Sequence, residues 1–88
     1  MLIKKFEIKN KLGLHLRATT LFVQTAMKYK SSIHVMKGNQ VANGKSLLGL
    51  TSLAAAQGSI IEVITDGEDE AELMNAVEEL IKNKFYEE

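Results

Sequence analysis

The sequence contains no cysteine and no proline, and neither sign of charge is in excess, since eleven basic residues balance eleven acidic ones. Without cysteine the chain can form neither disulfides nor a thiolate metal site. Nucleic-acid binders usually carry a basic stripe, and the densest basic stretch here, residues 4–11, is divided by Glu7. It is better explained as the solvated face of a strand. We therefore expect no nucleic-acid partner.

Long apolar runs are also lacking, because lysine, glutamate or glycine interrupts each of them, so no segment is expected to span or insert into a membrane. The first residues alternate like a strand and lack the parts of a signal peptide. These features predict a cytoplasmic protein. Its 88 residues suffice for one small domain, residues 1–88.

The chain does contain clear periodic patterns. Alternation with a period of two predicts strands near residues 2–8, 33–36, 40–42 and 61–65, and helical periodicity predicts a helix over residues 14–29. Asn39 follows Gly38 in a two-residue hairpin turn. Ser46 is a suitable N-cap for a short second helix, and Asp69 with Glu72 resembles a capping box that opens the last helix. The predicted order is βαββαβα, with the helices in one layer against the sheet.

The first candidate site is His15, within the segment Gly13-Leu14-His15-Leu16-Arg17. The start of a helix presents unpaired backbone N–H groups and therefore attracts anions. A neutral imidazole is a nucleophile, and Arg17 adds a planar, permanently charged group suited to phosphate oxygens. This arrangement favours phosphoryl transfer through His15, although a histidine at a helix start can also serve only as a cap or packing residue.

The second feature is a surplus of apolar residues. A helical stripe about opposite the core stripe consists of Leu16, Thr20, Val23 and Met27, and the short second helix adds three leucines. We assign Val23 and Leu50 to the core. For Leu16, Leu47 and Leu48 a docking surface is favoured over a wide core face.

Two other sites are considered and set aside. Residues 44–46 are similar to the end of a phosphate-binding P-loop, but position 39 is asparagine where that motif needs glycine. His15 and His34 lie on different predicted elements without carboxylates at ligand spacing. We therefore expect neither a metal ion nor another cofactor.

Three motifs together resemble the HPr family, the phosphocarriers of the bacterial phosphoenolpyruvate-dependent phosphotransferase system. They are Gly-Leu-His-Leu-Arg at 13–17, Asn-Gly-Lys-Ser-Leu-Leu-Gly-Leu at 43–50 and Asp-Glu-Ala-Glu-Leu at 69–73. The resemblance extends nearly end to end without gaps. It implies an α+β, HPr-like open-faced β-sandwich, in which a four-stranded antiparallel sheet of order 1-4-2-3 is covered on one face by three helices.

The resemblance also implies a function. His15 would take a phosphoryl group on Nδ1 from Enzyme I and donate it to IIA domains in sugar uptake or regulation, while Arg17 stabilises the phosphohistidine. Such a protein is a carrier and not an enzyme, and we expect a monomer. The docking patch implied for its partners consists of Leu16, Thr20, Gln24, Met27, Leu47, Leu48 and Thr51.

Ser46 matches the serine that a dedicated HPr kinase/phosphorylase modifies in many bacteria. A phosphate there would suit the helix terminus and would place a dianion within the docking patch. An ordinary N-cap serine is equally compatible with the sequence, so both roles stay open.

The chain departs from the family pattern at Ala18, where proline is usual, and at Leu16, where alanine or threonine is common. These changes are expected to affect partner choice and the first helical turn. The paralogue Crh lacks the active histidine, so His15 argues against that assignment. The alternative function is a regulatory binding module, of the nitrogen-type branch, that signals through its phosphorylation state.

Overall fold

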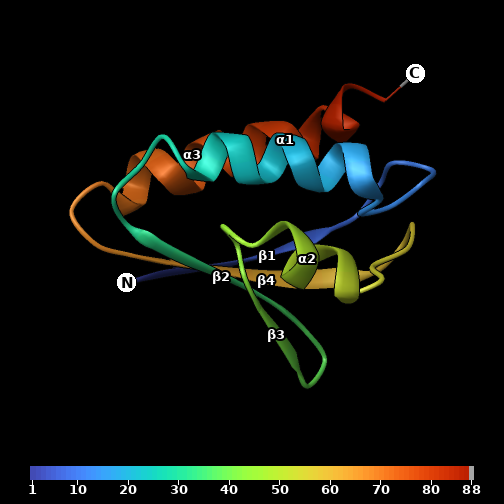
Figure 1. Ribbon diagram of the computed structural model, residues 1–88, viewed down its shortest axis with the longest axis horizontal. Coiled ribbons are helices and arrows are strands. Elements are labelled where there is room, and N and C mark those ends of the chain that lie inside the picture. The colour runs from blue at the N-terminus through green and yellow to red at the C-terminus, as the bar shows by residue number, and fades with distance from the viewer. Residues whose placement is uncertain (88) are drawn as a thin grey trace.

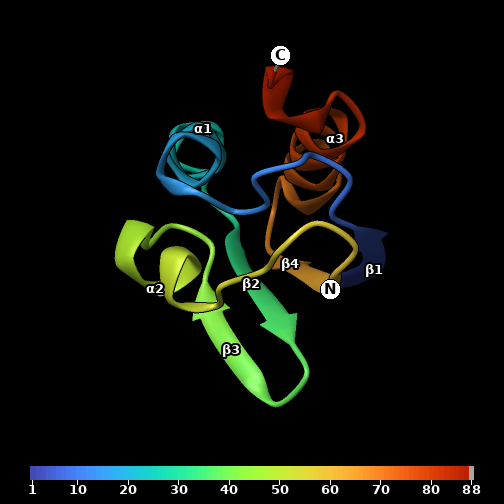
Figure 2. The ribbon, with the colours of Figure 1, turned by 90° about the vertical axis from the view of Figure 1, so that its right-hand side faces the viewer.

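The computed structural model describes residues 1–87, which form a sheet with helices on one of its faces (Figures 1 and 2). The strands are β1 (Leu2–Glu7), β2 (Ser32–Lys37), β3 (Gln40–Asn43) and β4 (Ile60–Asp66), and the helices are α1 (Leu16–Ala26), α2 (Leu47–Ser52) and α3 (Glu70–Lys82). A short 3-10 turn, η1 (Lys84–Tyr86), follows α3. The sheet is antiparallel with order β1-β4-β2-β3, which confirms the predicted open-faced sandwich.

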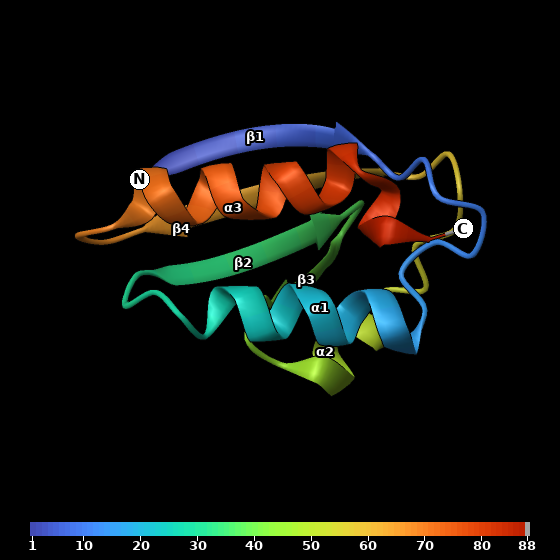
Figure 3. The ribbon, with the colours of Figure 1, turned by 90° about the horizontal axis from the view of Figure 1, so that it is seen from above.

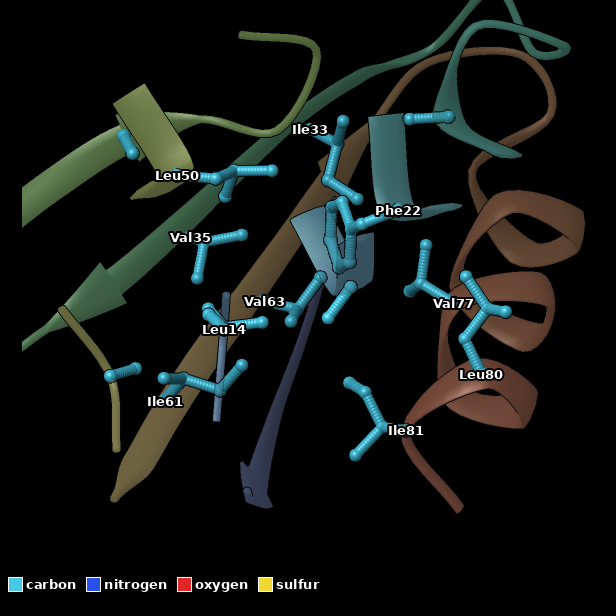
Figure 4. Packing of buried hydrophobic residues seen from close by; sticks show 14 of the residues in the cluster. Leu14, Phe22, Ile33, Val35, Leu50, Ile61, Val63, Val77, Leu80 and Ile81 are labelled. Atoms are coloured by element: carbon cyan, nitrogen blue, oxygen red, sulfur yellow. The ribbon is translucent and has the colours of Figure 1, made fainter. Parts of the chain in front are cut away.

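The core lies between the sheet and helices α1 and α3. Buried side chains alternate with more exposed ones along β4 and along the first part of β2, as the period of a strand requires. Phe22 of α1 is 1% exposed and lies among Ile33, Val63 and Val77 (Figure 4). Leu50 is fully buried and Val23 packs against the core, as predicted.

Helix α1 is shorter at both ends than the predicted helix over residues 14–29. Leu14 does not begin the helix, because its N–H donates to the carbonyl of Ala55 at 2.8 Å, in the loop before β4. At the other end, Lys28 and Tyr29 bond to carbonyls three residues back and so form turns. Leu14 is still buried, so the apolar pattern identified its burial correctly and its secondary structure wrongly.

The capping box predicted at Asp69 and Glu72 is wrong. Asp69 does occupy the N-cap position of α3, but its side chain makes no capping hydrogen bond. Its carboxylate instead accepts hydrogen bonds from the N–H groups of Lys30 and Ser31 and from the Ser31 hydroxyl, in the loop that joins α1 to β2. These donors, the Ser31 hydroxyl first, lower the pKa of Asp69 from its ordinary value of 3.8 to about 2.

Three segments distant in sequence meet beyond the end of β1. They are the loop between β1 and α1, the loop between α2 and β4, and the C-terminal turn after α3 (Figure 3). Gln57 donates to the carbonyl of Lys9, and Gly58 donates to that of Ile8, which ties the first two segments together. In residues 1–87, no helix has the length and apolar character needed to span a bilayer.

Candidate functional site

His15 is the N-cap residue of α1, with an extended backbone at φ −78° and ψ 176°. Its Nδ1 accepts a hydrogen bond from the backbone N–H of Arg17 at 3.3 Å, and its carbonyl accepts the first helical bond, from Thr19. A nitrogen that accepts such a bond carries a lone pair and no proton. The predicted position of His15 at the opening turn of the helix is therefore confirmed, and its Nδ1 faces the backbone N–H of Arg17.

Gly13 allows the chain to reach this position. Its φ of +65° favours glycine, and a Cβ there would lie 2.3 Å from the carbonyl oxygen of Ala55. The buried Asn10 closes the same loop, because its side-chain amide donates to the Gly13 carbonyl at 2.7 Å. The hydrogen bond from Leu14 to Ala55, described above, then fixes the position of Leu14, which is the residue before His15. The loop is thus held against the segment before β4.

The C-terminal segment reaches the other side of the imidazole. A carboxylate oxygen of Glu87 lies 3.5 Å from His15 Nε2, with side-chain exposures of 15% and 27%. The same oxygen accepts from the side chain of Asn10 at 2.9 Å, and the carboxylate also accepts from the N–H of Leu12. These hydrogen bonds, the one from Asn10 first, lower the pKa of Glu87, and the nearby His15 contributes in the same direction.

Sequence reasoning identified neither Asn10 nor Glu87 as a residue of the site. No local pattern could have indicated them, because Asn10 and Glu87 are 77 positions apart in the chain. The signal is the fold itself, which brings the C-terminal turn beside the first loop (Figure 3).

Arg17 lines the same surface hollow as His15, together with Leu12, Phe85 and Glu87. The hollow has a volume of about 460 Å³. Within residues 1–87, no hydrogen bond or ion pair engages the Arg17 guanidinium. It is exposed and close to the ring, so it can turn toward an anion bound there. The structure thus brings Arg17 and His15 together as predicted.

Ser46 caps α2, since its hydroxyl accepts a hydrogen bond from the N–H of Gly49 at 3.0 Å. Lys45 beside it donates to the carbonyl of Tyr29, which ties this end of α2 to the end of α1. The predicted cap is confirmed. The Ser46 side chain is half-buried.

The predicted docking patch lies on two helices that pack against each other. Thr19 of α1 and Thr51 of α2 meet with their hydroxyl oxygens 3.4 Å apart. Among the apolar members, Leu16 and Met27 are each 64% exposed, Leu47 is 39% exposed and Leu48 is 78% exposed. Gln24 and Thr51 are exposed, and Thr20 is half-buried. These leucines and this methionine are therefore outside the core.

His34 lies on β2 with an exposed side chain. Among the residues that the structure describes, no three histidine or carboxylate side chains are grouped so that they could hold a metal ion.

Comparison with known proteins relates this geometry to one family. Residues 2–83 match the family model described as "PTS HPr component phosphorylation site". The phosphocarrier protein HPr of Neisseria meningitidis serogroup A is 53% identical over 87 residues, which cover 99% of this chain and 98% of that protein.

Two solved structures from Thermoanaerobacter tengcongensis are also similar. HPr-C-His has a TM-score of 0.96 and 46% identity, and the match covers 100% of this chain and 99% of that one. An HPr dimer has a TM-score of 0.80 and 48% identity, with coverages of 93% and 94%.

Proposed function

Because the chain belongs to the HPr family of phosphocarrier proteins of the phosphotransferase system, we propose that His15 accepts a phosphoryl group from Enzyme I and passes it to IIA domains. The observation that carries the proposal is the position of His15 Nδ1. This nitrogen lies at the N-terminus of α1 and accepts a hydrogen bond from the backbone N–H of Arg17, at 3.3 Å.

The transfer uses the lone pair of Nδ1. As this lone pair forms the new bond to phosphorus, the bond from phosphorus to the donor breaks, and its electron pair stays with the donor. The N–H of Arg17, which donates to Nδ1, and the other unpaired N–H groups of the first helical turn then donate to the negatively charged phosphoryl oxygens. The guanidinium of Arg17 can hold two of these oxygens. Positioning and charge stabilisation are the main contributions that a protein makes to phosphoryl transfer.

The chemical step is tested by incubating the protein with Enzyme I and labelled phosphoenolpyruvate. We expect one label that acid removes and base does not, as for a phosphohistidine. His15→Ala should take up no label, while the control His34→Ala, at the exposed histidine of β2, should be labelled normally. Labelling of His15→Ala in the same acid-labile form would disprove the assignment.

The docking patch serves Enzyme I and the IIA domains in this proposal. Leu48 is its most exposed leucine, so Leu48→Glu should keep the fold and raise the KM of Enzyme I for this protein. The control is Val41→Glu, a position that is 59% exposed on β3 and outside the docking patch. An equal KM for both variants would exclude this patch as the docking surface.

Ser46 is proposed as a regulatory site for an HPr kinase/phosphorylase. A phosphate on this residue would lie next to Leu47 and Leu48, where it would hinder docking. Ser46→Asp should therefore raise the same KM while the protein remains folded. Unchanged kinetics would leave Ser46 as a helix cap only.

We propose a cytoplasmic protein that works as a monomer. The HPr dimer of Thermoanaerobacter tengcongensis makes the oligomeric state worth measuring. Light scattering after gel filtration should give the mass of one 9.8 kDa chain, and a dimer mass would contradict this part of the proposal.

A further inference from the structure

The turn after α3 is strained. Lys84, Phe85 and Tyr86 have φ values of 55°, 54° and 56°, in the left-handed region that side chains disfavour. Three consecutive residues of this kind persist only where other contacts hold them, and such strain is often found at functional sites. Here the side chain of Phe85 is one such contact, because it is only 3% exposed within the core.

The strained turn has a definite effect on the site. It reverses the chain after α3 and directs Glu87 to the loop before α1, where Asn10 and the N–H of Leu12 bind its carboxylate. The oxygen that Asn10 contacts is also the one 3.5 Å from His15 Nε2. The position of this oxygen is therefore set by the loop and the turn together.

We propose that Glu87 is a positioning residue for phosphoryl transfer. This inference rests on the proposed function of His15. A neutral imidazole carries its proton on either nitrogen, and only the form with the proton on Nε2 leaves Nδ1 free to attack. A carboxylate facing Nε2 stabilises that form, and the N–H of Arg17 at Nδ1 favours the same one.

Glu87 also acts during the transfer itself. When the lone pair of Nδ1 forms its bond to phosphorus, the ring keeps the Nε2 proton and gains one positive charge. The carboxylate lies beside the nitrogen that carries this proton, so it stabilises the charge as it develops. The distance of 3.5 Å is longer than an ordinary hydrogen bond, and contacts of this kind often shorten only when the reaction partner is bound. An aspartate orients the histidine of serine proteases in the same manner.

A purely structural role for Glu87 is the competing explanation, since Asn10 and Leu12 also bind the carboxylate. Glu87→Gln separates the two roles. The glutamine carbonyl still accepts from Asn10 and Leu12 and so keeps the segment in place, but the negative charge at Nε2 is lost. Glu72→Gln, on the exposed side of α3, is the matched control for loss of one negative charge.

The first measurement is the tautomer of His15 in the protein alone, from the ¹⁵N chemical shifts of its two ring nitrogens above the pH at which imidazole protonates. The wild type and Glu72→Gln should show the proton on Nε2. Glu87→Gln should show a raised population with the proton on Nδ1, at an unchanged melting temperature.

The second measurement is phosphorylation by Enzyme I under steady-state conditions. In Glu87→Gln the kcat should fall, by about tenfold if a charge-assisted contact is lost, while KM stays within about twofold of the wild-type value. An unchanged tautomer together with an unchanged kcat would overturn the inference. So would a fall in kcat matched by a lower melting temperature, because that result indicates a structural role. If Enzyme I never labels the wild-type protein but Glu87→Gln changes the tautomer, the proposed function of His15 is wrong. The influence of Glu87 on the ring would then still be supported.

Discussion

Substitution of Gly13 provides a quantitative test of how the loop before α1 is held. Alanine at this position must adopt a φ near +65°, which costs about 1–2 kcal/mol for a residue with a side chain. Its Cβ would also lie 2.3 Å from the carbonyl oxygen of Ala55 and 2.9 Å from the Cα of Ala56. Both atoms belong to the backbone, so neither can move without shifting the loop.

Such a shift would first break the hydrogen bond from the Leu14 N–H to the Ala55 carbonyl, which is 2.8 Å long. This bond contributes about 1 kcal/mol to the free energy of unfolding. We therefore expect Gly13→Ala to reduce the free energy of unfolding by about 2–3 kcal/mol. That is a large part of the roughly 5–15 kcal/mol typical of a domain. In a protein of this size it corresponds to a fall in melting temperature of about 8–24 °C.

Gly38 supplies the matched control. Its φ of +60° is nearly the same, but no atom lies within 4 Å of the position a Cβ would take. Gly38→Ala should therefore cost only the backbone term, about 1–2 kcal/mol. Urea unfolding followed by circular dichroism gives both values, provided the two variants share one m-value. Equal losses of stability would refute the argument, because the close approach to Ala55 would then contribute nothing.

The remaining predictions concern the core, the cap and the acidic residue before α3. Phe22→Ala should lower the free energy of unfolding by about 3–5 kcal/mol, because the ring fills the space between the sheet and α3; a loss below 1 kcal/mol in urea unfolding would contradict this packing. Ser46→Ala should lower the free energy of unfolding by about 1 kcal/mol, because the N-cap hydrogen bond of α2 is lost. The control is Ser52→Ala in the same helix, and equal losses of stability in the two variants would argue against the cap. The folded-state pKa of Asp69 lies below the unfolded one, so its contribution to stability is complete above pH 4 and is lost as the pH falls toward about 2. Melting temperatures of Asp69→Asn should therefore lie below those of the wild type at neutral pH and approach them in acid, and a constant difference across this range would contradict the assignment.

Most of the fold could be predicted because the helices and the central strands each have one buried face. Ile33 and Val35 alternate with exposed neighbours in β2, and Leu73, Val77 and Leu80 recur with helical spacing in α3. Such periodicity depends only on which residues avoid water. The two-residue turn at Gly38 and the cap at Ser46 were equally local, and both are confirmed.

The wrong predictions are those in which a distant partner competed with a local one. Asp69 fits a capping box by sequence. The packing of α1 beside α3, however, brings the N–H groups of Lys30 and Ser31 close, and these donate to its carboxylate instead. Leu14 fits a helix, but its N–H pairs with Ala55, 41 positions later, and the helix starts after it. Local spacing carries no information about either competitor.

The candidate site also combines one local contact with one contact between residues that are distant in the sequence. The contact at Nδ1 is local, since Arg17 lies two positions from His15, and it favours the ring form whose Nδ1 carries the lone pair that the proposed transfer uses. The contact at Nε2 comes from Glu87, far from His15 in the sequence, and favours the same form of the ring. A protein that keeps residues 13–17 but lacks the Glu87 carboxylate should therefore be phosphorylated on the same atom more slowly. Differences at Asn10 and Glu87 should accordingly alter transfer rates between relatives that share an identical histidine motif.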